Sequence, residues 1–172
     1  MSRLWDAALA LYGAEGVREL VLELQDEHGI DVPLLLALTW LDARGVAVDD
    51  TRYATLVAAS KGWQRDVVTP LRAARRALRP EAAPARRLGL DAAVRNALKR
   101  RVQALELEAE RHQLERLEAI AVDWPAAAPA AAPGPGLRRA LATAGPPVPP
   151  ARAAPLVAAA ERLAAGGGDA GH

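Results

Sequence analysis

Hydrophobic residues recur at helical spacing through most of the chain, and they predict one helix after another. Apolar side chains share one face over residues 3–12 and again over residues 14–28, with charged residues on the opposite faces. Gly29 directly follows the second pattern, where a helix end in the left-handed conformation favours glycine. The two patterns therefore predict a pair of amphipathic helices, each burying one face.

A third helix is predicted to begin at Asp31. The Asp31 side chain can cap the helix, and Pro33 is tolerated in the first turn because the N–H that it lacks would be unpaired there. Residues 34–41 then form an apolar run on all sides. Since a helix that is apolar all round usually lies at the centre of a bundle, we expect this segment to be fully buried.

Two shorter helices are predicted next. The first follows the capping residues Asp49 and Asp50, and Gly62 breaks its pattern. The second covers residues 63–79, and Pro70 inside it predicts a kink because a mid-helix proline removes a backbone donor.

The longest periodic stretch covers residues 90–122, after which the composition changes to Ala- and Pro-rich runs. Such runs bury too little large apolar surface to offset the entropy of ordering them. We therefore predict an all-α fold, a compact bundle of about five or six helices with a long C-terminal helix, over residues 1–124. A disordered low-complexity tail is predicted over residues 125–172, with at most a transient helix from Leu156 to Ala165.

The amino-acid composition limits which residues can fill the core and which kinds of chemistry the chain can perform. The chain has no Phe, one Met and four Trp, so Leu and Val, with Trp5, Trp40 and Trp63, must fill the core. It has no Cys, which excludes disulfides, thiolate nucleophiles and Cys-ligated metals. No apolar run reaches the ~18 residues of a membrane span, and Asp6 interrupts the short apolar run near the start. We predict a cytoplasmic protein without membrane contact, and the Ala, Arg and Pro excess is typical of a GC-rich bacterial genome.

The formal net charge of +1 conceals an uneven distribution. Residues 1–60 carry four Arg against ten carboxylates, whereas residues 61–103 carry twelve Lys or Arg against three carboxylates. Basic residues of this kind can meet a partner protein or the phosphates of a nucleic acid. The alternative is that they pack beside the acidic helices and form solvated or paired surface charges. The candidate contact residues are Arg72, Arg75, Arg76, Arg79, Arg100 and Arg101.

The densest polar cluster is the turn from Gln25 to Asp31. Asp26, Glu27 and His28 are consecutive and point in different directions around a helix, which disfavours a metal site. Gln25 and Asp26 can instead hydrogen-bond the start of the next helix and fix the turn. The chain contains no catalytic motif, metal-binding motif or phosphate-binding loop. We therefore predict no catalytic residue, no metal and no cofactor.

Several stretches occur in a distinctive order. They are W-D-x-A-L-x-L-Y from Trp5, G-V-R-E-L-V-L-E-L-Q-D-E-H-G-I-D-V from Gly16, V-V-T-P-L-R-A-A-R-R at 67–76 and E-L-E-A-E-R at 106–111. In this order they resemble an uncharacterised proteobacterial domain-of-unknown-function family of small helical proteins, over about residues 4–120. The resemblance implies an all-helical cytoplasmic domain and carries no known activity.

These observations lead to one leading hypothesis and two alternatives. The leading hypothesis is a protein-interaction or regulatory module whose partner is another protein. The first alternative is a nucleic-acid or ribosome-associated protein that uses the basic segment 61–103. The second alternative is an enzyme with its site near the Gln25–Asp31 turn.

Overall fold

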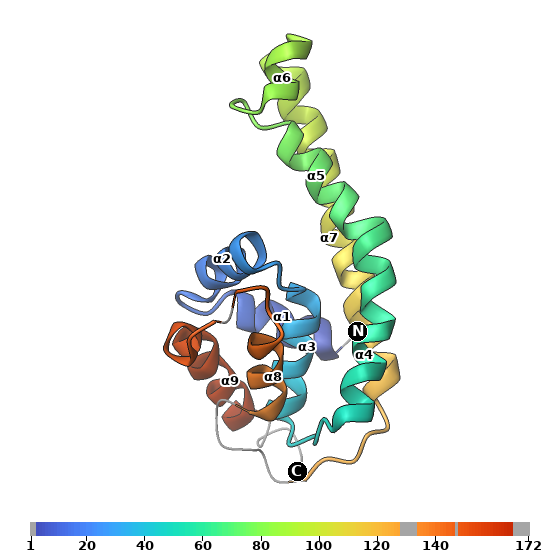
Figure 1. Cartoon of the computed structure of the whole chain (residues 1–172), viewed down its shortest axis with the longest axis vertical. Coiled ribbons are helices and arrows are strands. Elements are labelled where there is room, and N and C mark those ends of the chain that lie inside the picture. The colour runs from blue at the N-terminus through green and yellow to red at the C-terminus, as the bar shows by residue number, and fades with distance from the viewer. Residues whose placement is uncertain (1–2, 128–133, 147, 167–172) are drawn as a thin grey trace.

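The computed structural model describes residues 3–127, 134–146 and 148–166, which form an all-α protein with two parts (Figure 1). The globular body contains α1 (Arg3–Tyr12), α2 (Val17–His28), α3 (Val32–Ala43), α8 (Pro135–Ala142), the 3-10 turn η2 (Pro150–Ala153) and α9 (Ala154–Gly166). A long helical hairpin, here called the arm, contains α4 (Asp50–Trp63), the π-helical turn η1 (Gln64–Val68), α5 (Thr69–Ala77), α6 (Ala83–Leu88) and α7 (Ala92–Ala121). The predicted all-α class and the long helix near 90–122 are confirmed.

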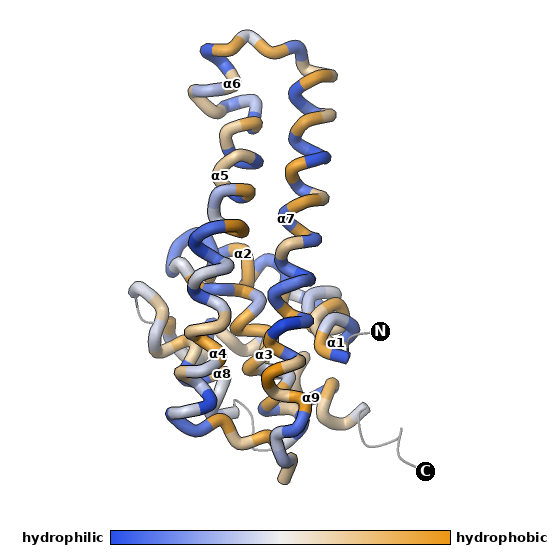
Figure 2. The backbone as a smooth tube through the Cα atoms, turned by 90° about the vertical axis from the view of Figure 1, so that its right-hand side faces the viewer, coloured by the Kyte–Doolittle hydropathy of each residue, from blue (hydrophilic) through white to orange (hydrophobic). Residues whose placement is uncertain are grey.

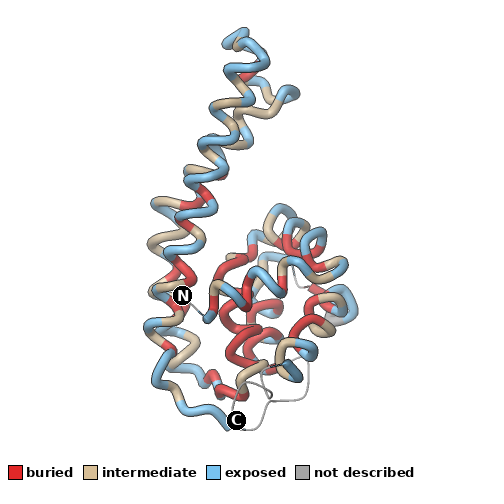
Figure 3. The backbone as a smooth tube through the Cα atoms, turned by 180° about the vertical axis from the view of Figure 1, so that it is seen from behind, coloured by how far each residue is buried: buried red, intermediate tan, exposed pale blue. Residues whose placement is uncertain are grey.

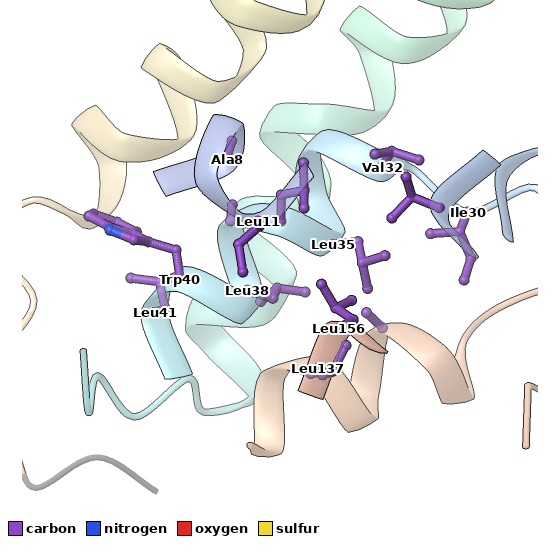
Figure 4. Close-up of a cluster of buried hydrophobic side chains, with 14 of the residues drawn as sticks. Ala8, Leu11, Ile30, Val32, Leu35, Leu38, Trp40, Leu41, Leu137 and Leu156 are labelled. Carbon is purple, nitrogen blue, oxygen red and sulfur yellow. The ribbon is translucent and has the colours of Figure 1, made fainter. Parts of the chain in front are cut away.

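The helix α3 lies at the centre of the body, as its sequence predicted. The Asp31 carboxylate accepts a hydrogen bond from the N–H of Leu34 at 3.2 Å and so caps the helix. Leu35 and Leu38 are completely buried. Figure 4 shows Leu38 in one cluster with Leu137 and Leu156, which come from α8 and α9. The apolar faces of α3 are therefore covered by helices from both ends of the chain.

The segment after residue 133 differs from the disordered tail that the composition predicted. In the described residues 134–146 and 148–166 the chain forms α8 and α9, which pack on α3 and bury Leu137 and Leu156 to 1% and 0% exposure. The prediction considered only the apolar surface that this segment contributes. It left out the surface of α3 that the segment covers, and burying that surface favours ordering as well. The rest of the predicted tail, at 128–133, 147 and 167–172, lies outside the described residues.

A buried carboxylate fixes the start of α8. Asp42, at the end of α3, accepts hydrogen bonds from the N–H groups of Gly136 at 3.0 Å and Leu137 at 2.8 Å. Burial raises the pKa of Asp42, and these two donors oppose the shift. A Cβ atom on Gly134 would lie within 2.5 Å of the Asp42 side chain, so only glycine allows this approach. Asp42 thus supplies the N-terminal cap that the α8 sequence lacks.

The first half of the arm is helical without interruption from Asp50 to Ala77, so the predicted break at Gly62 is wrong. A Cβ atom at Gly62 would meet nothing within 4 Å, so no packing demand interrupts the helix there. Pro70 is accommodated by the π-helical turn just before it, where the N–H of Thr69 donates to the carbonyl of Gln64, five residues earlier. Such a turn absorbs the irregularity that a missing proline N–H would otherwise cause.

The arm is far less buried than the body. Figure 3 shows buried residues concentrated in the body and at the base of the arm, whereas the outer arm is mostly exposed or intermediate. At the base, the Trp63 indole N–H donates to the Ala109 carbonyl at 2.9 Å and ties α4 to α7. Within the described part of the chain, no helix has the length and apolar character needed to cross a membrane.

Candidate functional site

Four of the predicted contact arginines lie along α5 and the turn after it. Arg75 and Arg76 follow Arg72 by three and four residues, which places all three on one side of α5, and Arg79 lies in the turn that follows. Three of them form ion pairs that join the arm internally or join it to α2, and they are Arg72, Arg75 and Arg76. The structure therefore places these three arginines in contacts within the chain.

The ion pairs centre on Glu106 of α7, whose exposure is 6%. Its carboxylate accepts from Arg72 Nε at 3.2 Å and from Arg75 Nε at 2.5 Å. Arg72, itself 8% exposed, also donates to Glu110 at 2.9 Å. Arg76 pairs with Asp26 of α2 and so links the arm to the body. Buried charges of this kind persist only when they are paired and hydrogen-bonded.

Asp31 carries a second polar network beside the first. Its carboxylate accepts from the side-chain amides of Gln64 at 2.9 Å and Gln113 at 3.0 Å, and from the Ser60 hydroxyl. Together with the cap on Leu34, these contacts connect α3 to the arm helices. Burial raises the pKa of Asp31, although the hydrogen bonds act in the opposite direction.

The raised pKa of Asp31 predicts a specific pH dependence. A carboxyl group whose pKa is higher in the folded state stabilises the fold most below the unfolded pKa, and this contribution is lost as pH rises through the folded pKa. As pH rises through that range, the unfolding free energy of the wild type should therefore fall relative to that of Asp31→Asn. Urea titrations at a series of pH values measure it. Asp123→Asn, an exposed control, should show no such trend, and parallel curves for wild type and Asp31→Asn would contradict the prediction.

A cleft of about 430 Å³ separates α1 and α2 of the body from α5 and α7 of the arm. Its apolar wall includes Trp5, Tyr12 and three leucines that remain strongly exposed: Leu9 at 53%, Leu22 at 39% and Leu107 at 53%. These leucines come from three different helices, and all three line this cleft. Exposed apolar groups gathered in this way are typical of binding sites.

Charged and neutral polar side chains line the same cleft. Arg75, Glu106 and Glu110 reach it from the ion-pair cluster, and Gln25 and Asp26 reach it from α2. Burial raises the pKa of the Tyr12 phenol and of the Glu110 carboxyl. Two further cations line the cleft, Arg18 and Arg79, and within the described residues neither pairs with an acidic side chain. The cleft thus offers an apolar wall beside two cations that an acidic group could neutralise.

The structure separates the remaining two candidate arginines from this cleft. Arg100 and Arg101 lie near the outer end of the arm and are exposed. The outer arm carries six basic residues against Glu81 and Asp91, and no ion pair joins the six to an acidic side chain in the described ranges. The six are Arg86, Arg87, Arg95, Lys99, Arg100 and Arg101.

Of the polar residues that line the cleft, Gln25, Asp26, Arg75 and Arg79 were candidates from the sequence, whereas Arg18, Glu106 and Glu110 were not. The exposed leucines were not candidates either. The signal was available, since Leu9, Leu22 and Leu107 are apolar residues that fall outside the core-facing stripe of their helices. An off-stripe leucine is common on protein surfaces, so each alone carries no functional meaning. Only the three-dimensional structure shows that these three leucines line the same cleft.

A possible ligand set for a metal ion occurs at the end of α2. Atoms of Glu23, Glu27 and His28 lie within 4.8 Å of one another. However, Glu23 pairs with Arg152 at 2.6 Å, and the His28 Nδ1 lies 2.8 Å from the Pro146 carbonyl oxygen. Both contacts attach the α9 side of the body to α2, and we assign these residues that structural role.

Comparisons with known proteins locate the chain in one family. The family model described as "Protein of unknown function (DUF2390)" matches residues 3–117, more than half of the chain. The match covers nearly the range of the resemblance seen in the sequence, about residues 4–120, and confirms it. A search of curated proteins finds no match, and a search of solved structures finds none either.

Proposed function

We propose that this chain, which belongs to the DUF2390 family, is a cytoplasmic protein-interaction module that binds an acidic, apolar segment of a partner protein in the cleft between body and arm. The observation that carries the proposal is that Leu9, Leu22 and Leu107, from three different helices, line one cleft and remain exposed there. Apolar anchors of the partner would pack against these leucines, and its carboxylates would face Arg18 and Arg79.

The chemistry of the cleft supports a peptide-like occupant. Two aromatic side chains, Trp5 and Tyr12, lie half-buried in the wall, and aromatic residues are enriched where proteins bind one another. The cations without internal acidic partners favour a negatively charged segment over a basic one. We propose no reaction at the Gln25–Asp31 turn, because Asp26 and Asp31 use their carboxylates to join helices.

Nucleic-acid binding is the second candidate, and one observation favours it. The six basic residues of the outer arm have no acidic partner among the described residues, so a phosphate backbone could meet them. This surface lies away from the cleft, with Leu88 among its exposed side chains at 70% exposure. The two candidates therefore predict contacts at different positions of the chain.

Site-specific photo-crosslinking separates the two candidates. A photoreactive amino acid is placed singly at position 22, 107, 88 or 122 of the full chain, which is then irradiated in native lysate with and without nuclease. The proposal predicts protein adducts at positions 22 and 107 that survive nuclease, with crosslinked peptides rich in Asp or Glu and aliphatic residues. Position 122, where Val122 is 54% exposed outside the cleft, is the matched control and should give none.

Other results would overturn the proposal. Absence of a protein adduct at both cleft positions, or equal adducts at position 122, would remove the cleft as the binding site. A nuclease-sensitive adduct at position 88 alone would replace the proposal with nucleic-acid binding through the outer arm.

A further inference from the structure

The outer face of α7 carries a hydrophobic seam that nothing in the described structure covers. Val94, Leu98 and Leu105 are 51%, 39% and 53% exposed. With Arg101, Glu108 and His112 they follow one another at alternating steps of four and three residues. This is the spacing of the contact positions in a coiled coil. Figure 2 shows apolar positions recurring along the whole of α7, including the outer part that lies beyond the body.

The seam faces away from the proposed binding cleft. Leu105 belongs to the seam and Leu107 to the cleft, and two residues along an α-helix are separated by about 200° around its axis. Exposed apolar residues therefore lie on two opposite sides of α7. A partner segment bound in the cleft would leave the seam uncovered.

The charges along α7 are divided between its two halves. From residue 92 to 103 the helix carries four basic residues and no acidic one, whereas from 104 to 121 it carries five glutamates against two arginines. Of these glutamates, Glu106 and Glu110 are already paired with Arg72 and Arg75 across the hairpin, whereas the seam itself carries Arg101 and Glu108. A parallel copy of α7 would place like charges of the seam side by side, but an antiparallel copy would place Arg101 beside Glu108 of its partner, so the seam is complementary to a reversed copy of itself.

We propose that the protein forms an antiparallel homodimer through this seam, with the two-fold axis near Leu105. In a two-fold interface the same residues meet twice, so Arg101 of each copy lies opposite Glu108 of the other. Leu105 of both copies packs at the centre, with Leu98 and Val94 further out on each side. A nucleic acid fits this surface less well, because Glu108 on the seam would repel its phosphates.

A reciprocal charge reversal tests the dimer. Arg101→Glu and Glu108→Arg are made in separate full-length chains, and mass is measured by size-exclusion chromatography with light scattering over a range of concentrations. Each variant alone should dimerise about tenfold more weakly than wild type or worse, because like charges then meet twice. Mixing the two should restore a dimer of wild-type strength containing one copy of each, since both contacts become attractive again.

Two substitutions of exposed leucines on α7 by aspartate provide a matched control. Leu105→Asp should abolish dimerisation in every mixture, whereas Leu107→Asp, equally exposed but in the cleft, should leave it unchanged. Circular dichroism checks that helix content is retained. A monomeric wild type, a mixed pair that stays monomeric, a dimer lost on nuclease treatment, or a dimer broken by Leu107→Asp would each overturn the proposal.

Discussion

Glu106→Ala is expected to reduce the free energy of unfolding by about 3–5 kcal/mol, the range seen when one partner of a buried ion pair is removed. The substitution leaves the guanidinium groups of Arg72 and Arg75 without the carboxylate that both of them contact. Arg72 is 8% exposed, so water cannot replace the lost partner without local opening. Chemical denaturation of the purified full chain measures the change.

Two further variants show whether the loss comes from the buried charge. Glu161→Ala removes a glutamate from α9 at an exposed position and should change the unfolding free energy by about 0.5 kcal/mol or less. Replacing Arg72 and Arg75 by Met together with Glu106 by Leu should recover most of the stability, because apolar side chains of similar volume often substitute well for buried ion pairs. Equal losses of unfolding free energy in Glu106→Ala and Glu161→Ala would show that Glu106 is not part of a buried ion-pair cluster in solution.

Leu156→Ala is expected to cost about 2–5 kcal/mol, as large-to-small substitutions at fully buried positions do. Leu156 has 0% exposure and lies against α3. A composition-based view of the same segment predicts no cost, since a disordered tail has no core to lose. Thermal and denaturant unfolding of the full chain therefore distinguishes a packed α9 from a disordered one.

The same substitution at an exposed leucine is the control. Leu88→Ala, at a residue with 70% exposure, should change the unfolding free energy by about 0.5 kcal/mol or less. A chain that ends at residue 124 should lose cooperative unfolding, because it lacks both α8 and α9 over the faces of α3. A cooperative transition of wild-type strength in that shortened chain would contradict the packing described above.

The features that sequence reasoning predicted well are those that depend on near neighbours in the chain. Asp31 and Asp49 were expected to cap helices, and each accepts a hydrogen bond from the N–H three residues later. Gly29 was expected to end α2 in the left-handed conformation and has a φ of 65°. The apolar run of α3 likewise predicted its central position.

The features that it missed depend on pairs far apart in the sequence. Arg72 was a candidate for contact with a partner, but Glu106, 34 residues later, pairs with it inside the chain and makes its burial possible. The α8 sequence lacks its own capping side chain, and Asp42 supplies the cap from 94 residues earlier. A pattern along one segment contains no information about such partners, so the ion pairs, the cleft and the ordered C-terminal helices could not be predicted from it.

The order of helices in the body has a consequence for synthesis on the ribosome. The arm is a local hairpin, and α4 through α7 can pair with one another once they have emerged, since contacts between neighbouring segments form fastest. The faces of α3 that α8 and α9 cover stay open until those two helices, which follow the arm in the chain, have been made. The nascent protein thus exposes its most apolar helix while the arm is being synthesised, and its body closes only after the arm is complete.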